Sequence, residues 1–398
     1  MIGIPWRSAK LNLPIVPEEP AILLGPVYPP PLSPVDIEAR VQTDLQSIAG
    51  QLQAARRIVL VVEDASRVTH TAGLVTAIHR QISAIRGGPS GFRVIVAAGA
   101  HDRMDPSVLE HKTGDTLTPR IHHCLDESQL VPVGTSRAGI PLIFQRDVVG
   151  ADLRLAIATV NIHPMAGFSG GGKLLVPGVA GLATIAAFHQ LPKGHPGERV
   201  TPMRQLIEEV VALLPFTYCW HLISNGAGEI VRIHSGANLQ SFESAIAELL
   251  PMVSLEQPPE LCDRLYLDCR PFHQNMVGTF KTLHQIPLLL KPGETAIVIN
   301  EACHGIGSHH WRLDPFVIEN EKEYWRNRLQ DYRVIVLTNH AAIAESRKLF
   351  PEDLTWVGTP AELLSICKEP ASSSIILAHA PLALIQSKKH SSSTAQKV

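Results

Sequence analysis

Short runs of β-branched apolar residues alternate with helical stretches along this chain, and this alternation most constrains its fold. Residues 58–62, Ile-Val-Leu-Val-Val, have the composition of a strand covered on both faces of a parallel sheet. Residues 72–86 follow with helical periodicity. Further strands are predicted at 92–98 and 153–160. Strands that alternate with helices in this way predict an α/β fold with mostly parallel sheets.

A second series of the same kind follows a segment rich in proline and glutamate at residues 251–263. It contains predicted strands at 264–268, 295–299, 332–337 and 374–378. The sequence therefore predicts two α/β domains, 1–258 and 259–386, followed by a polar, disordered tail at 387–398.

The composition excludes several classes of protein. The chain has 398 residues, 45% of them hydrophobic, and a formal net charge of −2, so it has neither the composition of a disordered chain nor a general attraction to nucleic acid. The most apolar stretch, residues 174–188, is interrupted by Pro177 and Gly181 and is too short to span a membrane. Six scattered cysteines without a CxxC pair, and no recognisable signal peptide, favour a cytoplasmic protein with reduced thiols.

Polar and glycine residues gather where the predicted strands end. Asp64 and Arg67 follow the first strand, Gly99-Ala-His101 follows the second, and His163 follows the third. In α/β sheets, ligands bind at the carboxyl ends of the strands. We therefore expect a functional site at this edge.

The most distinctive segment, Gly167–Lys173, matches the first part of a phosphate-binding GxxxxGK loop. The next residue of that motif must be Ser or Thr, whose hydroxyl binds magnesium, but here it is Leu174. Pro177 would also interrupt the helix that should follow. Two interpretations stay open at this point: a flexible surface turn, and a phosphate- or nucleotide-binding enzyme that uses backbone N–H groups of the loop.

Several motifs together resemble the lactate racemase family, whose members use a nickel-pincer nucleotide, a pyridinium mononucleotide that carries nickel. The resemblance covers most of residues 55–310. Its motifs are Asp64-Ala-Ser-Arg67, Gly99-Ala-His101, the segment from His163 to Lys173, Pro177-Gly178, His189, the segment from Cys269 to Lys281, and His304-Gly-Ile-Gly-Ser308.

The resemblance implies a racemase or epimerase that acts on a 2-hydroxy acid or a related hydroxyl compound. In the family reaction a base takes the hydroxyl proton while hydride moves to the pyridinium ring, and the planar ketone then accepts hydride on its other face. His101 and His163 would be the acid/base pair, a role suited to a group that titrates near neutral pH. Lys173 would carry the cofactor through a thioamide bond, and His189 would bind the nickel.

The resemblance also assigns supporting roles. Arg67 and Lys281 would bind the substrate, since a planar guanidinium holds a carboxylate through two parallel hydrogen bonds. Asp64 would support the cofactor or orient neighbouring groups. The three glycines of the loop would approach the cofactor through their backbone: Gly170, Gly171 and Gly172. We expect this site in the cleft between the two domains.

The second half of the chain departs from the family pattern. Gly278 stands where the family often has glutamine, and Val277 stands where it often has tyrosine. Arg270 and His273 also occupy positions where other residues are common. These differences argue against lactate itself and favour a larger or differently charged hydroxy acid, a polyol or a sugar acid. A non-catalytic binding protein on the same scaffold would have no need of the histidines and lysine named above.

Overall fold

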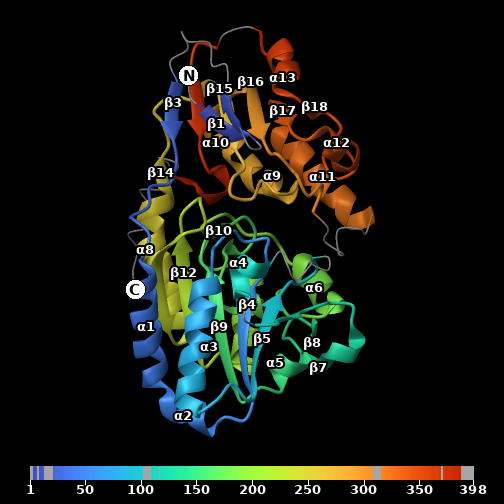
Figure 1. Ribbon diagram of the computed structural model, residues 1–398. Coiled ribbons are helices and arrows are strands. Elements are labelled where there is room, and N and C mark those ends of the chain that lie inside the picture. The colour runs from blue at the N-terminus through green and yellow to red at the C-terminus, as the bar shows by residue number, and fades with distance from the viewer. Residues whose placement is uncertain are drawn as a thin grey trace, which may run out of the picture. The chain divides into compact units, whose positions relative to one another are not determined.

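The computed structural model describes residues 3–6, 9–12, 21–101, 109–115, 117–307, 315–368 and 371–386. The chain divides into two compact units, which Figure 1 shows with their helices and strands labelled. The first unit contains Tyr28–Pro251. The second contains Met252–Gly307, the described residues from 315 onward, and those that precede Tyr28.

The first unit is built on a six-stranded sheet. Its strands pair in parallel except β13, which pairs antiparallel with β12. In spatial order they are β13 (Ile230–Gly236), β12 (Tyr218–Ser224), β9 (Leu153–Thr159), β4 (Ile58–Glu63), β5 (Phe92–Ala97) and β6 (Arg120–Ile121). Every residue of β4 is buried, as its apolar run predicts.

Helices and short elements complete this unit. Its helices are α1 (Pro34–Ser47), α2 (Ala49–Ala54), α3 (Ala72–Arg86), α4 (Glu110–Thr113), α5 (Arg146–Val149), α6 (Leu182–His189), α7 (Pro202–Leu213) and α8 (Asn238–Val253). A hairpin joins β7 (Leu130–Thr135) to β8 (Pro141–Gln145), and a shorter one joins β10 (Ile162–His163) to β11 (Gly167–Phe168). Helix α1 begins at Pro34, and the Ser33 side chain caps it by accepting a hydrogen bond from the Asp36 N–H.

The second unit contains another six-stranded sheet, all of whose pairs are parallel. Its order is β18 (Thr355–Val357), β17 (Arg333–Leu337), β16 (Leu290–Ile299), β15 (Cys262–Asp268), β19 (Ser374–Leu377) and β3 (Ala21–Leu24). Its helices are α9 (Val277–Thr282), α10 (Ile286–Leu289), α11 (Pro315–Leu329), α12 (His340–Ser346) and α13 (Pro360–Ile366). The remaining strands are β1 (Gly3–Trp6), β2 (Ala9–Asn12), β14 (Ser254–Glu256) and β20 (Leu384–Gln386).

These two sheets confirm the predicted α/β fold with mostly parallel strands. The units differ from the expected ranges 1–258 and 259–386 in two respects: the boundary falls between Pro251 and Met252, and the N-terminal segment groups with the second unit. The cause of the second difference is β3, which pairs with β19 at the edge of the second sheet. A short extended segment does not reveal its pairing partner in its own sequence. The predicted disordered tail, 387–398, lies outside the described residues.

In the described part of the chain, no helix has both the length and the apolar character that crossing a membrane requires.

Candidate active site

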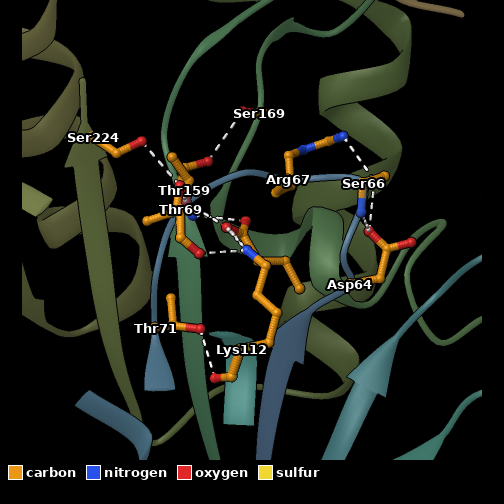
Figure 2. A network of polar contacts seen from close by, with 10 residues as sticks. Asp64, Ser66, Arg67, Thr69, Thr71, Lys112, Thr159, Ser169 and Ser224 are labelled. Atoms are coloured by element: carbon orange, nitrogen blue, oxygen red, sulfur yellow. Dashed lines mark hydrogen bonds and ion pairs between the residues drawn. The ribbon is translucent and has the colours of Figure 1, made fainter. Parts of the chain in front are cut away.

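Asp64 anchors the site at the carboxyl end of β4. The carboxylate is buried and accepts hydrogen bonds from the backbone N–H and the hydroxyl of Ser66, at 3.1 and 2.6 Å (Figure 2). Burial alone would raise its pKa, but the contact with His101 and the charge of Arg67 outweigh burial and bring the pKa to about 2. Asp64 is therefore an anion at neutral pH.

His101 meets this anion through Nδ1, which is hydrogen-bonded to Asp64 Oδ2. Because a carboxylate only accepts, Nδ1 carries the proton, and Nε2 of the neutral ring bears the lone pair. The side chain of His101 keeps 23% of its surface exposed, so a ligand can reach it. This arrangement orients the ring and makes Nε2 a base, as in the histidine–aspartate pairs of hydrolases.

His163 has the opposite arrangement at its Nδ1 atom. It lies in β10, and its Nδ1 accepts hydrogen bonds from the backbone N–H groups of Met165 and Ala166, at 3.2 and 3.1 Å. A backbone N–H only donates, so the neutral ring carries its proton on Nε2. The two predicted acid/base histidines therefore present different atoms: a lone pair on His101 and an N–H on His163.

Lys173 lies in a short 3-10 turn, Gly171–Leu174, and is partly exposed. Burial of its amine, together with the nearby positive charges of Arg204 and Arg67, lowers its pKa well below the usual range. A lowered pKa favours the neutral, nucleophilic form of a lysine amine. Arg67, Lys173 and the Asp64–His101 pair are thus brought together in the first unit, as the motifs predict.

The glycines before Lys173 have clear local reasons. Gly170 and Gly171 have φ of +89° and +60°, which favour glycine. A Cβ atom on Gly172 would lie 2.3 Å from Val211 Cγ2 and 2.7 Å from Ile207 Cγ2, so this residue packs against α7. Their predicted contact with a cofactor stays a prediction, since conformation and packing already account for the glycine at these positions.

His189 ends helix α6, and its Nδ1–H donates to the Ile185 carbonyl at 2.8 Å. This bond leaves the lone pair of the neutral ring on Nε2, the state in which histidine binds a metal. Phe188 relates this histidine to the lysine: its ring centroid lies 5.2 Å from that of His189 and 5.5 Å from Lys173 Nζ. Among the described residues, no group of three or more His, Cys, Asp or Glu could hold a metal ion.

Arg204 belongs to this site but carries no signal in the sequence. It is buried on α7, where it donates to the Phe168 carbonyl at 2.6 Å and lies over the ring of Phe242 at 4.6 Å. An arginine on an amphipathic helix is normally a solvated charge, and only its burial shows that it acts on Lys173. Glu63 and Lys112 likewise carry no signal in the sequence, because only the fold shows that these charged residues are buried.

Lys281, the other predicted substrate-binding residue, lies on α9 in the second unit, where its Nζ is 3.5 Å from the ring centroid of Phe272. The same unit explains Gly278. A Cβ atom there would lie 2.0 Å from the Phe272 carbonyl oxygen, so a glutamine at this position requires the backbone to move. Arg270 also has a local role, because its guanidinium forms a two-point ion pair with Asp268.

The fold and these residues define an α/β protein with a histidine–aspartate pair and a lysine of lowered pKa. Among known proteins, residues 29–201 match the lactate racemase N-terminal domain family. The chain is 28% identical over 136 residues to a lactate racemase of Lactiplantibacillus plantarum, and 26% identical over 149 residues to one of Thermoanaerobacterium thermosaccharolyticum. These matches cover 33% and 36% of this chain, and only 32% and 34% of those relatives.

The fold comparison extends over nearly the whole chain. The lactate racemase apoprotein from Thermoanaerobacterium thermosaccharolyticum has a TM-score of 0.79 at 18% identity, over 97% of this chain and 99% of that one. A Thermotoga maritima protein has a TM-score of 0.71 at 17% identity, over 91% and 100%. The resemblance to the lactate racemase family that the motifs predict is confirmed.

Proposed function

We propose that this protein is a racemase or epimerase of a 2-hydroxy acid or a related hydroxyl compound, and that it uses a nickel-pincer nucleotide attached to Lys173. The observation that carries the proposal is the buried Lys173 amine, whose pKa is lowered and which lies over the Phe188 ring. The same ring also packs against the imidazole of His189. This lysine lies inside the segment that matches the lactate racemase N-terminal domain.

The residues present fit such a cofactor. The neutral amine of Lys173 is suited to a thioamide bond, and the lone pair on His189 Nε2 is suited to nickel(II). When bound, the cofactor would supply the hydride acceptor and the remaining, sulfur- and carbon-based nickel ligands. One histidine then suffices as the protein's contribution to the metal.

The protein's own groups would handle the substrate's charge and proton. Arg67 offers a guanidinium to the substrate carboxylate. His101 presents a lone pair that accepts the hydroxyl proton, and Asp64 stabilises the imidazolium that forms. His163 presents an N–H toward which an oxygen of the substrate would be oriented. The gain from each proton transfer is typically 10²–10⁴-fold in rate.

We further propose that the second unit contributes Lys281 to substrate binding. The arrangement around Gly278 excludes a glutamine side chain from α9 without movement of the backbone. This supports a substrate other than lactate, with a different group where the family's glutamine amide would contact it.

The decisive experiment expresses the chain together with a cofactor-synthesis pathway. Intact-mass analysis is expected to find a covalent adduct that maps to Lys173, with nickel present by elemental analysis. The loaded protein is then incubated with single stereoisomers of lactate and of larger and dicarboxylic 2-hydroxy acids, and the products are separated by chiral chromatography. A protein without adduct and nickel, prepared beside a lactate racemase that acquires both, would contradict the proposal.

A further inference from the structure

A fully buried lysine lies beneath the loop that carries Asp64 and Arg67. Lys112, on the short helix α4, has no exposed surface, and its Nζ donates to the Thr69 carbonyl at 2.8 Å and pairs with Glu63 Oε1 at 3.5 Å (Figure 2). Glu63 immediately precedes Asp64, and Thr69 ends the loop. One ammonium group therefore joins both ends of the loop formed by residues 64–68.

The other contacts of this network reach the remaining strand ends. Glu63 accepts hydrogen bonds from the N–H of Thr159, at 3.0 Å, and from its hydroxyl, at the end of β9. Thr69 Oγ1 lies 2.7 Å from Thr159 Oγ1 and 2.9 Å from Ser224 Oγ on β12. The Ser169 hydroxyl, which precedes the glycine loop, donates to the Thr159 carbonyl at 3.0 Å. In Figure 2, Ser224, Ser169 and Lys112 reach Thr69 and Thr159 from different sides.

We propose that Glu63 and Lys112 are positioning residues, which hold Asp64 and Arg67 in the geometry that orients His101 and receives the substrate. The catalytic purpose of this positioning rests on the proposed function, whereas the predicted effect on the geometry of the loop does not. Neither residue is part of the motifs that resemble the family.

Energetics favour positioning over stability as the purpose of the pair. Burial lowers the pKa of Lys112, and the charges of Glu63 and Asp64 oppose this change. Replacing a buried ion pair with neutral side chains of similar volume is often neutral or stabilising. What the pair provides is a fixed geometry at both ends of a short loop. Geometry of this kind matters because a displacement of about 1 Å can lower a catalytic rate about 100-fold.

The test uses the cofactor-free chain with the double substitution Glu63→Gln/Lys112→Met, which removes both charges and leaves neither one unpaired. The matched control is Lys322→Met/Glu352→Gln, which removes a nearly buried lysine and its partner, 3.0 Å apart, in the second unit. Two readouts are compared with the parent: the low-field proton resonance of His101 Nδ1–H, assigned by its loss in His101→Asn, and hydrogen exchange at residues 64–71.

The expected result is specific to the loop. In Glu63→Gln/Lys112→Met the His101 resonance shifts or disappears and residues 64–71 exchange at least about tenfold faster, with a melting temperature near that of the parent. The control keeps both properties. An unchanged resonance with parental exchange would overturn the proposal, and so would faster exchange throughout the first unit in proportion to lost stability. Both readouts are independent of turnover, so they stay decisive if the racemase proposal fails.

Discussion

The two parallel sheets of this protein share an architecture, yet the polar groups at their carboxyl ends are organised in different ways. In the first unit, Asp64, His101 and Lys173 are held by hydrogen bonds and nearby charges that leave a lone pair and a nucleophilic amine available. In the second unit, polar groups at the strand ends bind one another: Arg270 pairs with Asp268, and Asn300 donates to Thr279 at 2.8 Å.

This difference indicates a division of labour. Groups with shifted pKa values cluster at functional sites, and in the first unit Asp64 and Lys173 have shifted pKa values beside the buried Lys112–Glu63 pair. We therefore propose that the first unit carries the reaction and that the second contributes to the choice of substrate. The following predictions test this assignment.

The largest expected effect is that of Lys173. In Lys173→Ala the covalent adduct and all turnover should be lost while the fold persists. Lys173→Arg should not restore them, because a guanidinium stays protonated and is a poor nucleophile. Intact mass and circular dichroism of both variants provide the measurement. An adduct of parental mass in either variant would place the attachment on another residue.

His189→Ala should abolish nickel retention, because in the proposed function this histidine is the protein's one ligand to nickel and the cofactor would supply the rest. The fold should be unaffected, since the hydrogen bond from the ring to the Ile185 carbonyl lies within its own helix. Nickel is measured by elemental analysis of adduct-bearing protein, with His195→Ala as the control at an exposed histidine nearby. Equal nickel in the two variants would remove His189 from the metal site.

His101→Ala and His163→Ala should each lower turnover by about 10²–10⁴-fold. Because the Nδ1 atom donates in His101 and accepts in His163, replacement by glutamine is expected to restore turnover to different extents. His163→Gln keeps an N–H donor and should recover more activity than His101→Gln, which offers no comparable base. Turnover of a confirmed substrate, normalised to nickel and adduct, measures both. Near-parental turnover in either alanine variant would make that histidine structural.

A smaller effect is expected in the second unit. Gly278→Gln restores the residue common in the family, but its Cβ meets the Phe272 carbonyl oxygen. We expect a loss of about 1–3 kcal/mol in the free energy of unfolding, typical of overpacking. Urea unfolding followed by fluorescence measures it, with Val277→Ala, at the half-buried first residue of α9, as a neighbouring control. A variant as stable as the parent would show that the backbone around α9 and Phe272 adapts to the added side chain.

The smallest effect concerns acid stability. The pKa of Asp64 is about 2 in the folded chain and 3.8 in its ordinary state, so the folded state binds this proton less well. Its contribution, about 2 kcal/mol, is complete above pH 4 and is lost as the pH falls toward 2. Asp64→Asn should therefore flatten the dependence of unfolding free energy on pH in this window. An unchanged slope would mean that His101 and Arg67 do not stabilise the anion.

Much of the fold could be predicted from local sequence. The apolar run 58–62 produced a buried strand, and the helical periodicity of residues 72–86 produced α3. The predicted strands also placed three site residues at or after strand ends: Asp64, His101 and His163. Parallel strands end at a common edge of the sheet, so these residues were expected near one another. The motifs also led to the family that the comparisons confirm.

What the sequence could not provide depends on contacts between distant segments. Strand β3 pairs with β19 from the other end of the chain, and distant segments bury Lys112 and Arg204. The obstruction at Gly278 comes from one backbone oxygen, that of Phe272. The fold also decides which ring nitrogen of His101 and of His163 carries the proton, because it supplies the hydrogen-bond partner of each Nδ1. By itself the sequence determined which residues are the candidates for the chemistry, because residue type and strand position are local properties. Only the tertiary structure decided their charge and orientation, because burial and hydrogen-bond partners come from the folded surroundings.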